Sequence, residues 1–262
     1  MYAFDYQRPV SVRDATGLAT DDAMFLAGGQ TLIPTLKQRL RQASILIDLG
    51  AVPDLRGIAL SGKTLTIGAM TRHAEVAASP DVRKAIPALA DLAGRIGDPQ
   101  VRNCGTLGGS IANNDPAADY PAALVALGAV IHTSARSIPA EAFFTGMFET
   151  ALKTGELVLK VDFPLAKRAA FAKFRNPASR YAIAAVFIAE TDAGVCVAVI
   201  GAGPGVFRVP DMESALDKNF SAAALAGITV PADGLNEDMH ATADYRAHLV
   251  GVMAARAVAS IT

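Results

Sequence analysis

Two glycine-containing segments carry the residue types best suited to bind a phosphate-bearing ligand. The first is Ala27-Gly28-Gly29-Gln30-Thr31, which follows the apolar run Met24–Ala27 and precedes a helical pattern. Without a Cβ, glycine lets the backbone approach a phosphate closely, and it can adopt φ > 0. The N–H groups of such a turn, with the positive end of the next helix, stabilise negative charge. The alternative is that Gly28-Gly29 only makes a tight turn, because glycine pairs are common in turns.

The second segment runs from Val101 to Ser110 as Val-Arg-Asn-Cys-Gly-Thr-Leu-Gly-Gly-Ser and continues through Asn113-Asn114-Asp115-Pro116. Long loops inside compact domains are usually functional or disordered. Disorder fits poorly, because Val101, Leu107 and Ile111 give this loop apolar anchors. Two glycine loops, each able to wrap part of a diphosphate, favour a dinucleotide site. The residues alone leave open the alternative that both are turns.

Other motifs lack the spacing that their chemistry needs. Gly201-Ala202-Gly203-Pro204-Gly205 resembles a dinucleotide-binding fingerprint, but Val206 stands where G-x-G-x-x-G needs its third glycine. We therefore interpret this segment as a turn.

The remaining polar candidates do not form a catalytic or metal-binding set. The four histidines have no metal-ligand spacing, and each is expected to be a surface or satisfied residue: His73, His132, His240 and His248. Cys104 is interpreted as a small loop thiol, and Ser110 has no base beside it in the sequence. We expect no catalytic residue and no metal ligand in this chain.

The elements that position the two loops follow from apolar periodicity and turn residues. A helix with Thr31 as its N-cap should present Leu32, Ile33, Leu36 and Leu40 on one face. Asp119 is placed to be the N-cap of a later helix, which ends a long loop from Gly97 to Asp119. Strands are expected at Ile45–Leu49, Thr64–Ile67, Val130–Thr133 and Glu156–Phe163, and helices at about Arg72–Ala78, Asp81–Ile96 and Pro121–Leu127.

A charged, proline-bearing stretch, Pro164-Leu165-Ala166-Lys167-Arg168, separates two apolar regions and predicts a domain boundary. The expected domains are residues 1–164 and 168–262. In the second, Ala182–Glu190 and Val195–Ile200 should pair through the turn at Asp192-Ala193-Gly194. A final helix should carry Tyr245, Leu249, Val252 and Met253 on one stripe. Strands interspersed with helices, without a regular βαβ alternation, favour an α+β architecture.

Composition excludes several classes of protein. The 262 residues carry 24 basic and 25 acidic side chains without a basic run, which argues against a nucleic-acid partner. The longest uncharged stretch is too short and too interrupted for a membrane span, and the segment Met1–Tyr6 does not resemble a signal peptide. Two cysteines cannot supply the four thiolates of an iron–sulfur cluster or a structural zinc site. The expected setting is reducing cytoplasm.

Several motifs in one order resemble the FAD-binding medium subunit of the carbon monoxide dehydrogenase and xanthine dehydrogenase family, the molybdenum hydroxylases. The likeness spans nearly the whole chain. The segments that carry it are Phe4–Pro9, Ala27–Pro34, Ile67–Thr71, Asp98–Asn103, Gly105–Ser110, Asp115–Pro121, and Tyr245-Arg246 with the helix after it.

The resemblance implies a fold and a cofactor site. The fold is a two-part FAD-binding domain of the vanillyl-alcohol oxidase type, followed by a smaller C-terminal α+β domain of the carbon monoxide dehydrogenase flavoprotein type. The segments Ala27–Thr31 (Ala27, Gly28, Gly29, Gln30 and Thr31) and Thr106–Ser110 (Thr106, Leu107, Gly108, Gly109 and Ser110) would hold the FAD diphosphate. Asp119 would accept hydrogen bonds from the ribityl hydroxyls, and Leu107 would lie against the isoalloxazine ring. Lys173 and Tyr181 would reach the flavin from the C-terminal domain.

The resemblance also implies partners: a small subunit with two-iron clusters and a large molybdenum-cofactor subunit, in a dimer of heterotrimers. This chain would collect electrons on FAD and pass them to an external acceptor. The alternatives are a free-standing flavin oxidoreductase and a non-catalytic nucleotide-binding partner. One departure concerns charge: many relatives have Gly-Asp where this chain has Ser179-Arg180, which puts the flavin potential and the acceptor in doubt. A second is that, with two cysteines, the extra four-iron cluster of some relatives is not expected.

Overall fold

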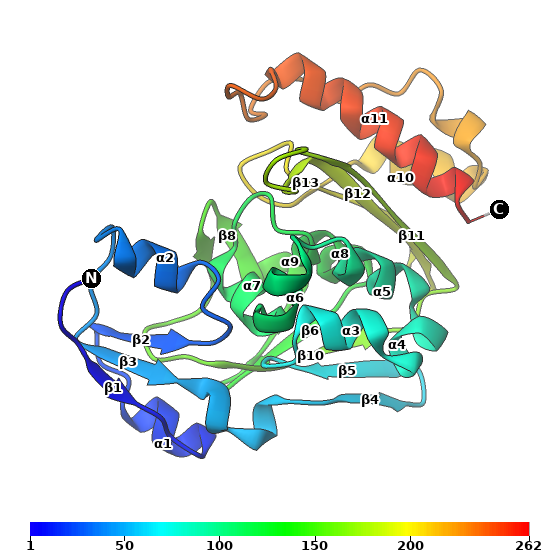
Figure 1. The fold of residues 1–262 in the computed structure, drawn as a ribbon. Helices are drawn as coiled ribbons and strands as arrows, with labels where there is room; N and C mark the ends of the chain where they lie inside the picture. The colour runs from blue at the N-terminus through cyan, green and yellow to red at the C-terminus, as the bar shows by residue number, and fades with distance from the viewer. Residues whose placement is uncertain (262) are drawn as a thin grey trace.

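The computed structural model describes residues 1–261, which form an α+β arrangement of sheets and helices (Figure 1). The first sheet is small and parallel, with β3 (Ile45–Asp48) between β1 (Asp5–Gln7) and β2 (Ala23–Leu26). Helices α1 (Val12–Gly17) and α2 (Leu32–Lys37) connect its strands. Two 3-10 turns, η1 (Leu49–Ala51) and η2 (Pro53–Leu55), lead into the second sheet. The predicted order of strand, glycine turn and helix around the first loop is confirmed.

The second sheet is antiparallel and forms the floor of a layer of helices (Figure 1). Its strands lie in the order β4 (Ile58–Ser61), β5 (Thr64–Gly68), β10 (Val158–Pro164), β6 (Val130–Thr133) and β7 (Ser137–Pro139). The helices above it are α3 (His73–Ala78), α4 (Pro80–Ala85), α5 (Pro87–Gly94), α6 (Pro99–Cys104), α7 (Leu107–Asn113) and α8 (Tyr120–Ala126). A short helix, α9 (Ala140–Phe143), leads into the hairpin β8 (Phe144–Gly146) and β9 (Glu149–Thr150). Apolar side chains of sheet and helices share one core.

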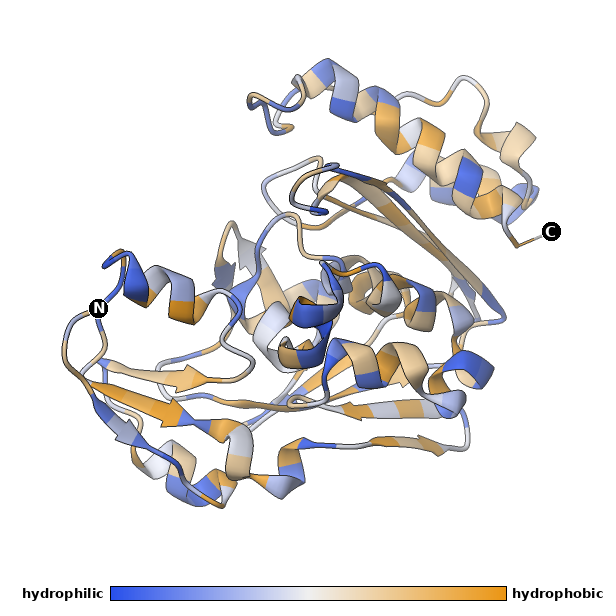
Figure 2. Cartoon of the chain, in the orientation of Figure 1, coloured by the Kyte–Doolittle hydropathy of each residue, from blue (hydrophilic) through white to orange (hydrophobic). Residues whose placement is uncertain are grey.

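The third sheet follows the predicted boundary and is buried on both faces. Its order is β11 (Arg168–Arg175), β12 (Ala182–Thr191), β13 (Gly194–Ile200) and β14 (Phe207–Arg208), all antiparallel. Alternate residues of β12 face different cores: Phe187 belongs to the core with the second sheet, while Val186 packs toward the C-terminal helices. Those elements are α10 (Pro210–Lys218), η3 (Ala222–Leu225) and α11 (Ala243–Ala259). Figure 2 shows β12 and β13 coloured mainly as hydrophobic, as a strand covered on both sides requires.

Three helix expectations are corrected. The single helix expected over Asp81–Ile96 is broken, because Pro87 disfavours the helical region for Ile86, which adopts φ −143°. The long loop expected from Gly97 to Asp119 contains helices α6 and α7, each begun by a capping side chain. Helix α2 ends at Lys37, so Leu40 lies outside it and is 69% exposed.

Two further expectations concern the C-terminal part. The segment Gly201–Gly205 is a turn, as predicted, with φ +81° at Gly201. Helix α10 was not predicted from the sequence; it begins at Pro210, which occupies the first turn, where proline is tolerated. No helix within residues 1–261 is both long and apolar enough to cross a bilayer.

A buried arginine holds the last helix to the third sheet. Arg246 of α11 is 4% exposed, and its Nη1 donates to the carbonyl oxygens of Ile183 at 2.7 Å and Gly201 at 3.0 Å. Its Nη2 pairs with the half-exposed Asp238 at 2.7 Å. The guanidinium therefore binds two buried carbonyl groups of the third sheet and its following turn, and Asn236 Nδ2 donates to one of them, Gly201, at 3.4 Å.

Replacement of Arg246 tests this clamp. Arg246→Ala should lower the free energy of unfolding by about 2–5 kcal/mol, because the buried carbonyl oxygens of Ile183 and Gly201 each lose a charged donor. The measurement is urea unfolding followed by far-ultraviolet circular dichroism. Arg256→Ala, an exposed arginine on the same helix, is the control and should change stability little. Equal losses in both variants would contradict the clamp.

Candidate functional site

A cavity of about 420 Å³ lies where the two glycine loops, helix α8 and the β11–β12 turn meet. This volume is in the range of small-molecule sites, roughly 300–1,000 Å³. Twelve of the thirteen residues predicted to contact a cofactor line it, although they come from four separate parts of the sequence. They are Ala27, Gly28, Gly29, Gln30, Thr31, Thr106, Gly108, Gly109, Ser110, Asp119, Lys173 and Tyr181.

The first loop presents free backbone donors to this cavity. Gly29 adopts φ +69°, a conformation that favours glycine. Among residues 1–261, the backbone N–H groups of residues 28 to 31 have no hydrogen-bond acceptor. Thr31 stands at the N-cap of α2, as predicted, but its side chain makes no capping bond. The loop therefore has the unpaired donors that an anion needs.

The second loop differs, because its backbone donors are already used. The N–H of Leu107 donates to the carbonyl oxygen of Thr71 at 3.1 Å, and that of Gly108 to the carbonyl oxygen of Ala69 at 2.8 Å. The next two N–H groups, of Gly109 and Ser110, are bonded to the side chain and carbonyl of Thr106. Backbone donors for a ligand phosphate are thus available in the first loop and not at the start of α7, where Ser110 is a cavity-lining residue with a side-chain hydroxyl.

The glycines also let the two loops touch. A Cβ placed on Gly28 would lie 2.2 Å from the carbonyl oxygen of Cys104, and one on Gly109 would lie 3.2 Å from Ala27 Cβ. A Cβ on Gly108 would lie 2.5 Å from Ala69 Cβ. From the sequence, these glycines were expected to let a ligand phosphate approach the backbone. The structure adds that Gly28 is needed for packing between the loops, and Gly108 for packing against Ala69.

Leu107 is the one predicted contact residue that does not line the cavity. Its side chain is fully buried in the core shared by the second sheet and the helices. Since Thr106 caps α7, the next residue points inward, toward the core. The predicted contact of Leu107 with a ring therefore has no support in this geometry, and Ile96 is an apolar residue that does line the cavity.

Asp119 and Lys173 form a buried ion pair in the cavity wall. Their side chains are 4% and 3% exposed, and Lys173 Nζ donates to Asp119 Oδ2 at 2.6 Å. Asp119 was expected to cap α8, but its carboxylate makes no capping bond and turns to the lysine. Burial raises the pKa of Asp119 to about 6, opposed by the charge of Lys173. Its Oδ1 is buried without a partner among residues 1–261, so it can accept a hydrogen bond from a ligand.

Tyr181 ends a turn that is fixed by Asn176. The Asn176 side chain accepts the N–H groups of Ala178 and Ser179, and its backbone N–H donates to the carbonyl oxygen of Tyr181. Tyr181 remains 50% exposed and lines the cavity. Partial burial raises the pKa of its phenol, as do the charges of nearby aspartates. It is therefore held as a neutral phenol at the edge of the cavity.

His73 is a cavity residue that sequence reasoning missed. The expectation of a surface or satisfied histidine is wrong, because His73 is 5% exposed and its Nδ1 is buried without a partner among residues 1–261. Burial lowers its pKa to about 4, with a further contribution from the charge of Arg102. Its ring lies against Tyr120 and beside Gly105, where a Cβ would lie 2.6 Å from its Nε2. The sequence did offer one indication that His73 lies at the site, because it follows the segment Ile67–Thr71 by two residues.

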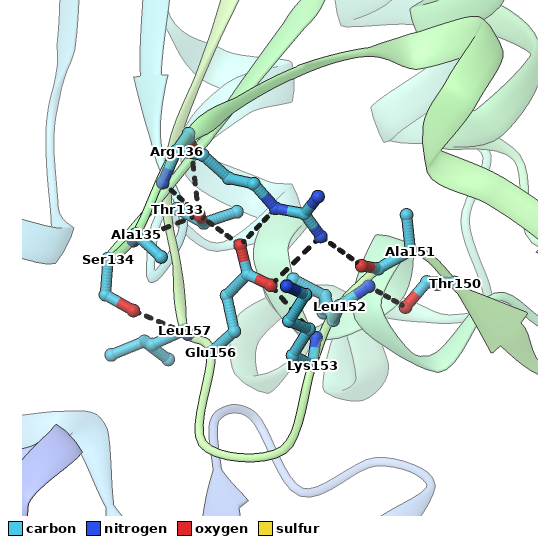
Figure 3. Close-up of polar contacts among 10 residues, drawn as sticks. All are labelled: Thr133, Ser134, Ala135, Arg136, Thr150, Ala151, Leu152, Lys153, Glu156 and Leu157. Atoms are coloured by element: carbon cyan, nitrogen blue, oxygen red, sulfur yellow. Dashed lines mark hydrogen bonds and ion pairs between the residues drawn. The ribbon is translucent and has the colours of Figure 1, made fainter.

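An ion-pair network builds another part of the wall (Figure 3). Glu156 is buried, and it accepts hydrogen bonds from Arg136 Nε at 3.1 Å, Thr133 Oγ1 at 2.6 Å and the N–H of Lys153 at 2.9 Å. Arg136 also donates to the carbonyl oxygen of Ala151. These bonds hold the loop before β10, which lines the cavity through residues that include Leu152 and Glu156 itself.

Gly28→Ala tests the contact between the loops. The added Cβ would meet the Cys104 carbonyl, so we expect the loops to separate and the free energy of unfolding to fall by about 2 kcal/mol or more. Thermal unfolding measures the change. Gly205→Ala is the control, because a Cβ there meets nothing within 4 Å. If Gly28→Ala were as stable as Gly205→Ala, the close contact would be wrong.

The Glu156 network predicts a pH dependence. Burial alone would raise its pKa, but hydrogen bonds from Arg136 and Thr133 lower it from 4.5 to about 2. A depressed carboxyl pKa stabilises the folded state above pH 4.5, and this contribution is lost as the pH falls from about 4.5 to about 2. The stability difference between the wild type and Glu156→Gln should therefore shrink over that interval, measured by urea unfolding. Glu237→Gln, at an exposed carboxylate, is the control, and a difference independent of pH would contradict the network.

Comparison with known proteins identifies the same family that the sequence motifs resemble, over nearly the whole chain. Residues 2–166 match a family described as the FAD binding domain in molybdopterin dehydrogenase. The alpha subunit of the 6-hydroxypseudooxynicotine dehydrogenase complex of Paenarthrobacter nicotinovorans is 35% identical, over 98% of this chain and 94% of that protein. The carbon monoxide dehydrogenase medium chain of Hydrogenophaga pseudoflava is also 35% identical, over 97% and 96%. A solved carbon monoxide dehydrogenase structure from that organism matches 99% of this chain and 97% of its own with a TM-score of 0.89, at 34% identity.

Proposed function

The chain belongs to the FAD-binding medium subunits of the molybdenum hydroxylases, and we propose that it carries electrons, through FAD, from the iron–sulfur clusters of a partner subunit to an external acceptor. Its cofactor is FAD, and it is a flavoprotein oxidoreductase subunit. Substrate hydroxylation then belongs to a separate molybdenum-containing subunit. The observation that carries the proposal is one cavity that gathers residues from four parts of the sequence between two glycine loops.

The residues present fit a dinucleotide. The free N–H groups of residues 28 to 31 would bind the diphosphate, and the Ser110 side chain lies across the cavity from them. Asp119 Oδ1, buried and unpaired, would accept a hydrogen bond from a ribityl hydroxyl, while Lys173 holds the carboxylate in place. FAD supplies the redox chemistry: it accepts electrons singly and releases a pair.

The remaining residues orient the cofactor and exclude water. Ile96 and Tyr181 would lie at the ring end of the site, and the loop held by Arg136 and Glu156 would close another side. No group within residues 1–261 forms a three-residue metal-ligand cluster.

The assembly and location are also proposals. Curated relatives are named as a subunit of a dehydrogenase complex and as a medium chain, which supports a complex of several chains. We propose that its partners are a small iron–sulfur subunit and a large molybdenum subunit, in a dimer of heterotrimers in the cytoplasm. We also propose that residues 1–164 form the FAD domain and 168–262 the C-terminal domain. The end of the family match at residue 166 supports that division.

The first test is the visible absorption spectrum of the purified full chain. We expect flavin bands without iron–sulfur shoulders, one FAD per chain released by acid, and no hydroxylase turnover without partners. Asp119→Asn should weaken FAD binding by about tenfold, because an amide is a weaker acceptor than a carboxylate. Asp244→Asn, an exposed residue far along the chain, is the control. If neither the chain nor the co-expressed complex bound FAD, the proposed function would be lost.

A further inference from the structure

Two arginines meet at one end of the cavity without a carboxylate partner. Arg102 Nη1 donates to the carbonyl oxygens of Ile96 at 2.9 Å and Gly97 at 3.1 Å. Arg180 Nη1 donates to the same Gly97 oxygen at 3.3 Å. Neither guanidinium forms an ion pair within residues 1–261, whereas nearby Arg95 pairs with Asp91 at 2.9 Å. Two like charges therefore converge on one carbonyl oxygen, an arrangement that a bound anion would stabilise.

The position of Arg180 is fixed at a cost in backbone energy. It adopts φ +65°, a left-handed conformation that is uncommon for an L-residue with a long side chain. The turn enforces it: the Arg180 N–H donates to the carbonyl oxygen of Asn176, and the buried Asn176 side chain holds the two preceding residues. Strained residues of this kind persist where the surroundings over-determine them, and they cluster at binding sites.

The two arginines differ in exposure, because Arg102 is half-buried and does not itself line the cavity. Arg180 is exposed and lines the cavity beside Tyr181, and Gly97, which both arginines contact, lines it too. The charge of Arg102 reaches His73, a cavity residue, because it contributes to the lowered pKa of that imidazole. Among the other charges at this end, Lys173 is paired with Asp119, while Asp115 accepts the N–H of Ala117 and forms no ion pair within residues 1–261. Two unpaired arginines and one unpaired aspartate leave a positive balance of charge at this end.

From this geometry we propose that Arg102 and Arg180 form an anion-binding site at the mouth of the cavity, which takes the phosphate group of a small-molecule electron acceptor. The proposal rests on the proposed function, since an acceptor must approach the flavin from solvent. A guanidinium pair suits phosphate, because each can present two N–H donors to its oxygens. The site differs from the diphosphate-binding first loop, whose donors are backbone N–H groups.

The test uses the FAD-loaded full chain and inorganic pyrophosphate, so that bound FAD already occupies the glycine loops. Isothermal titration calorimetry should show one pyrophosphate per chain. Arg180→Gln and Arg102→Gln should each weaken binding by about tenfold or more, since a charge-assisted hydrogen bond is lost. Arg175→Gln, at an exposed arginine of the same strand–turn unit, is the matched control and should leave the affinity unchanged.

Each outcome decides the proposal. If the FAD-loaded wild type bound no pyrophosphate, or bound it equally well in Arg180→Gln, the site would be wrong. If Arg180→Gln instead weakened FAD itself while pyrophosphate failed to bind, the pair would serve the cofactor's own phosphates, and the proposal would also fail. Arg102→Gln removes two backbone contacts, so a loss of folding there leaves the exposed Arg180 as the deciding variant. Failure of the proposed function is seen separately, as absence of the flavin spectrum.

Discussion

The cavity depends on direct contact between two stretches of backbone. Gly28 lies so close to Cys104 and Gly105 that no side chain fits between them. This contact brings the small parallel sheet, which carries the first loop, against the helices that carry the second (Figure 1). The space left beside the contact is the cavity. The N–H groups of the first loop remain free, whereas those of the second loop donate hydrogen bonds to Thr71, Ala69 and Thr106.

Charges in the cavity are arranged in two different ways. Asp119 and Lys173 cancel each other in a dry setting, so their contribution is local and directional. Arg102 and Arg180 leave a net positive charge beside the solvent-exposed turn. Side chains 102 and 180, which come from α6 and from the turn between β11 and β12, therefore make the electrostatic potential at this end more positive. His73 stays neutral between them and the core, and so adds no charge of its own.

The sequence predicted much of the fold and most of the residues that line the site. Glycine pairs and apolar periods are local signals, and they located both loops, the β12–β13 hairpin and the last helix. The predicted capping role of Asp119 was wrong, because its side chain binds a partner far along the chain. Asp119 obeys a local rule for a helix cap, yet Lys173, 54 residues later, is the stronger partner.

Short polar helices were also missed, for a different reason. Helices α6 and α7 have too few apolar residues for a period to be visible, although Asp98 and Thr106 were suitable caps. His73 was judged only against Glu75 on its own helix. Its neighbours in the structure are Tyr120 and Gly105, which are distant in the sequence, so residue spacing along the helix could not indicate them.

The third sheet has a consequence for how the chain folds. Residues 182 to 189 of β12 carry no charge and no proline, and every one is buried in the finished molecule. An apolar, β-prone segment of this kind is an aggregation hazard while it is unpaired. One face is covered when α11 has packed, and the other when α8 is in place. A growing chain therefore leaves one face of β12 uncovered until α11 has been made, so the order of its elements creates a need for shielding during synthesis.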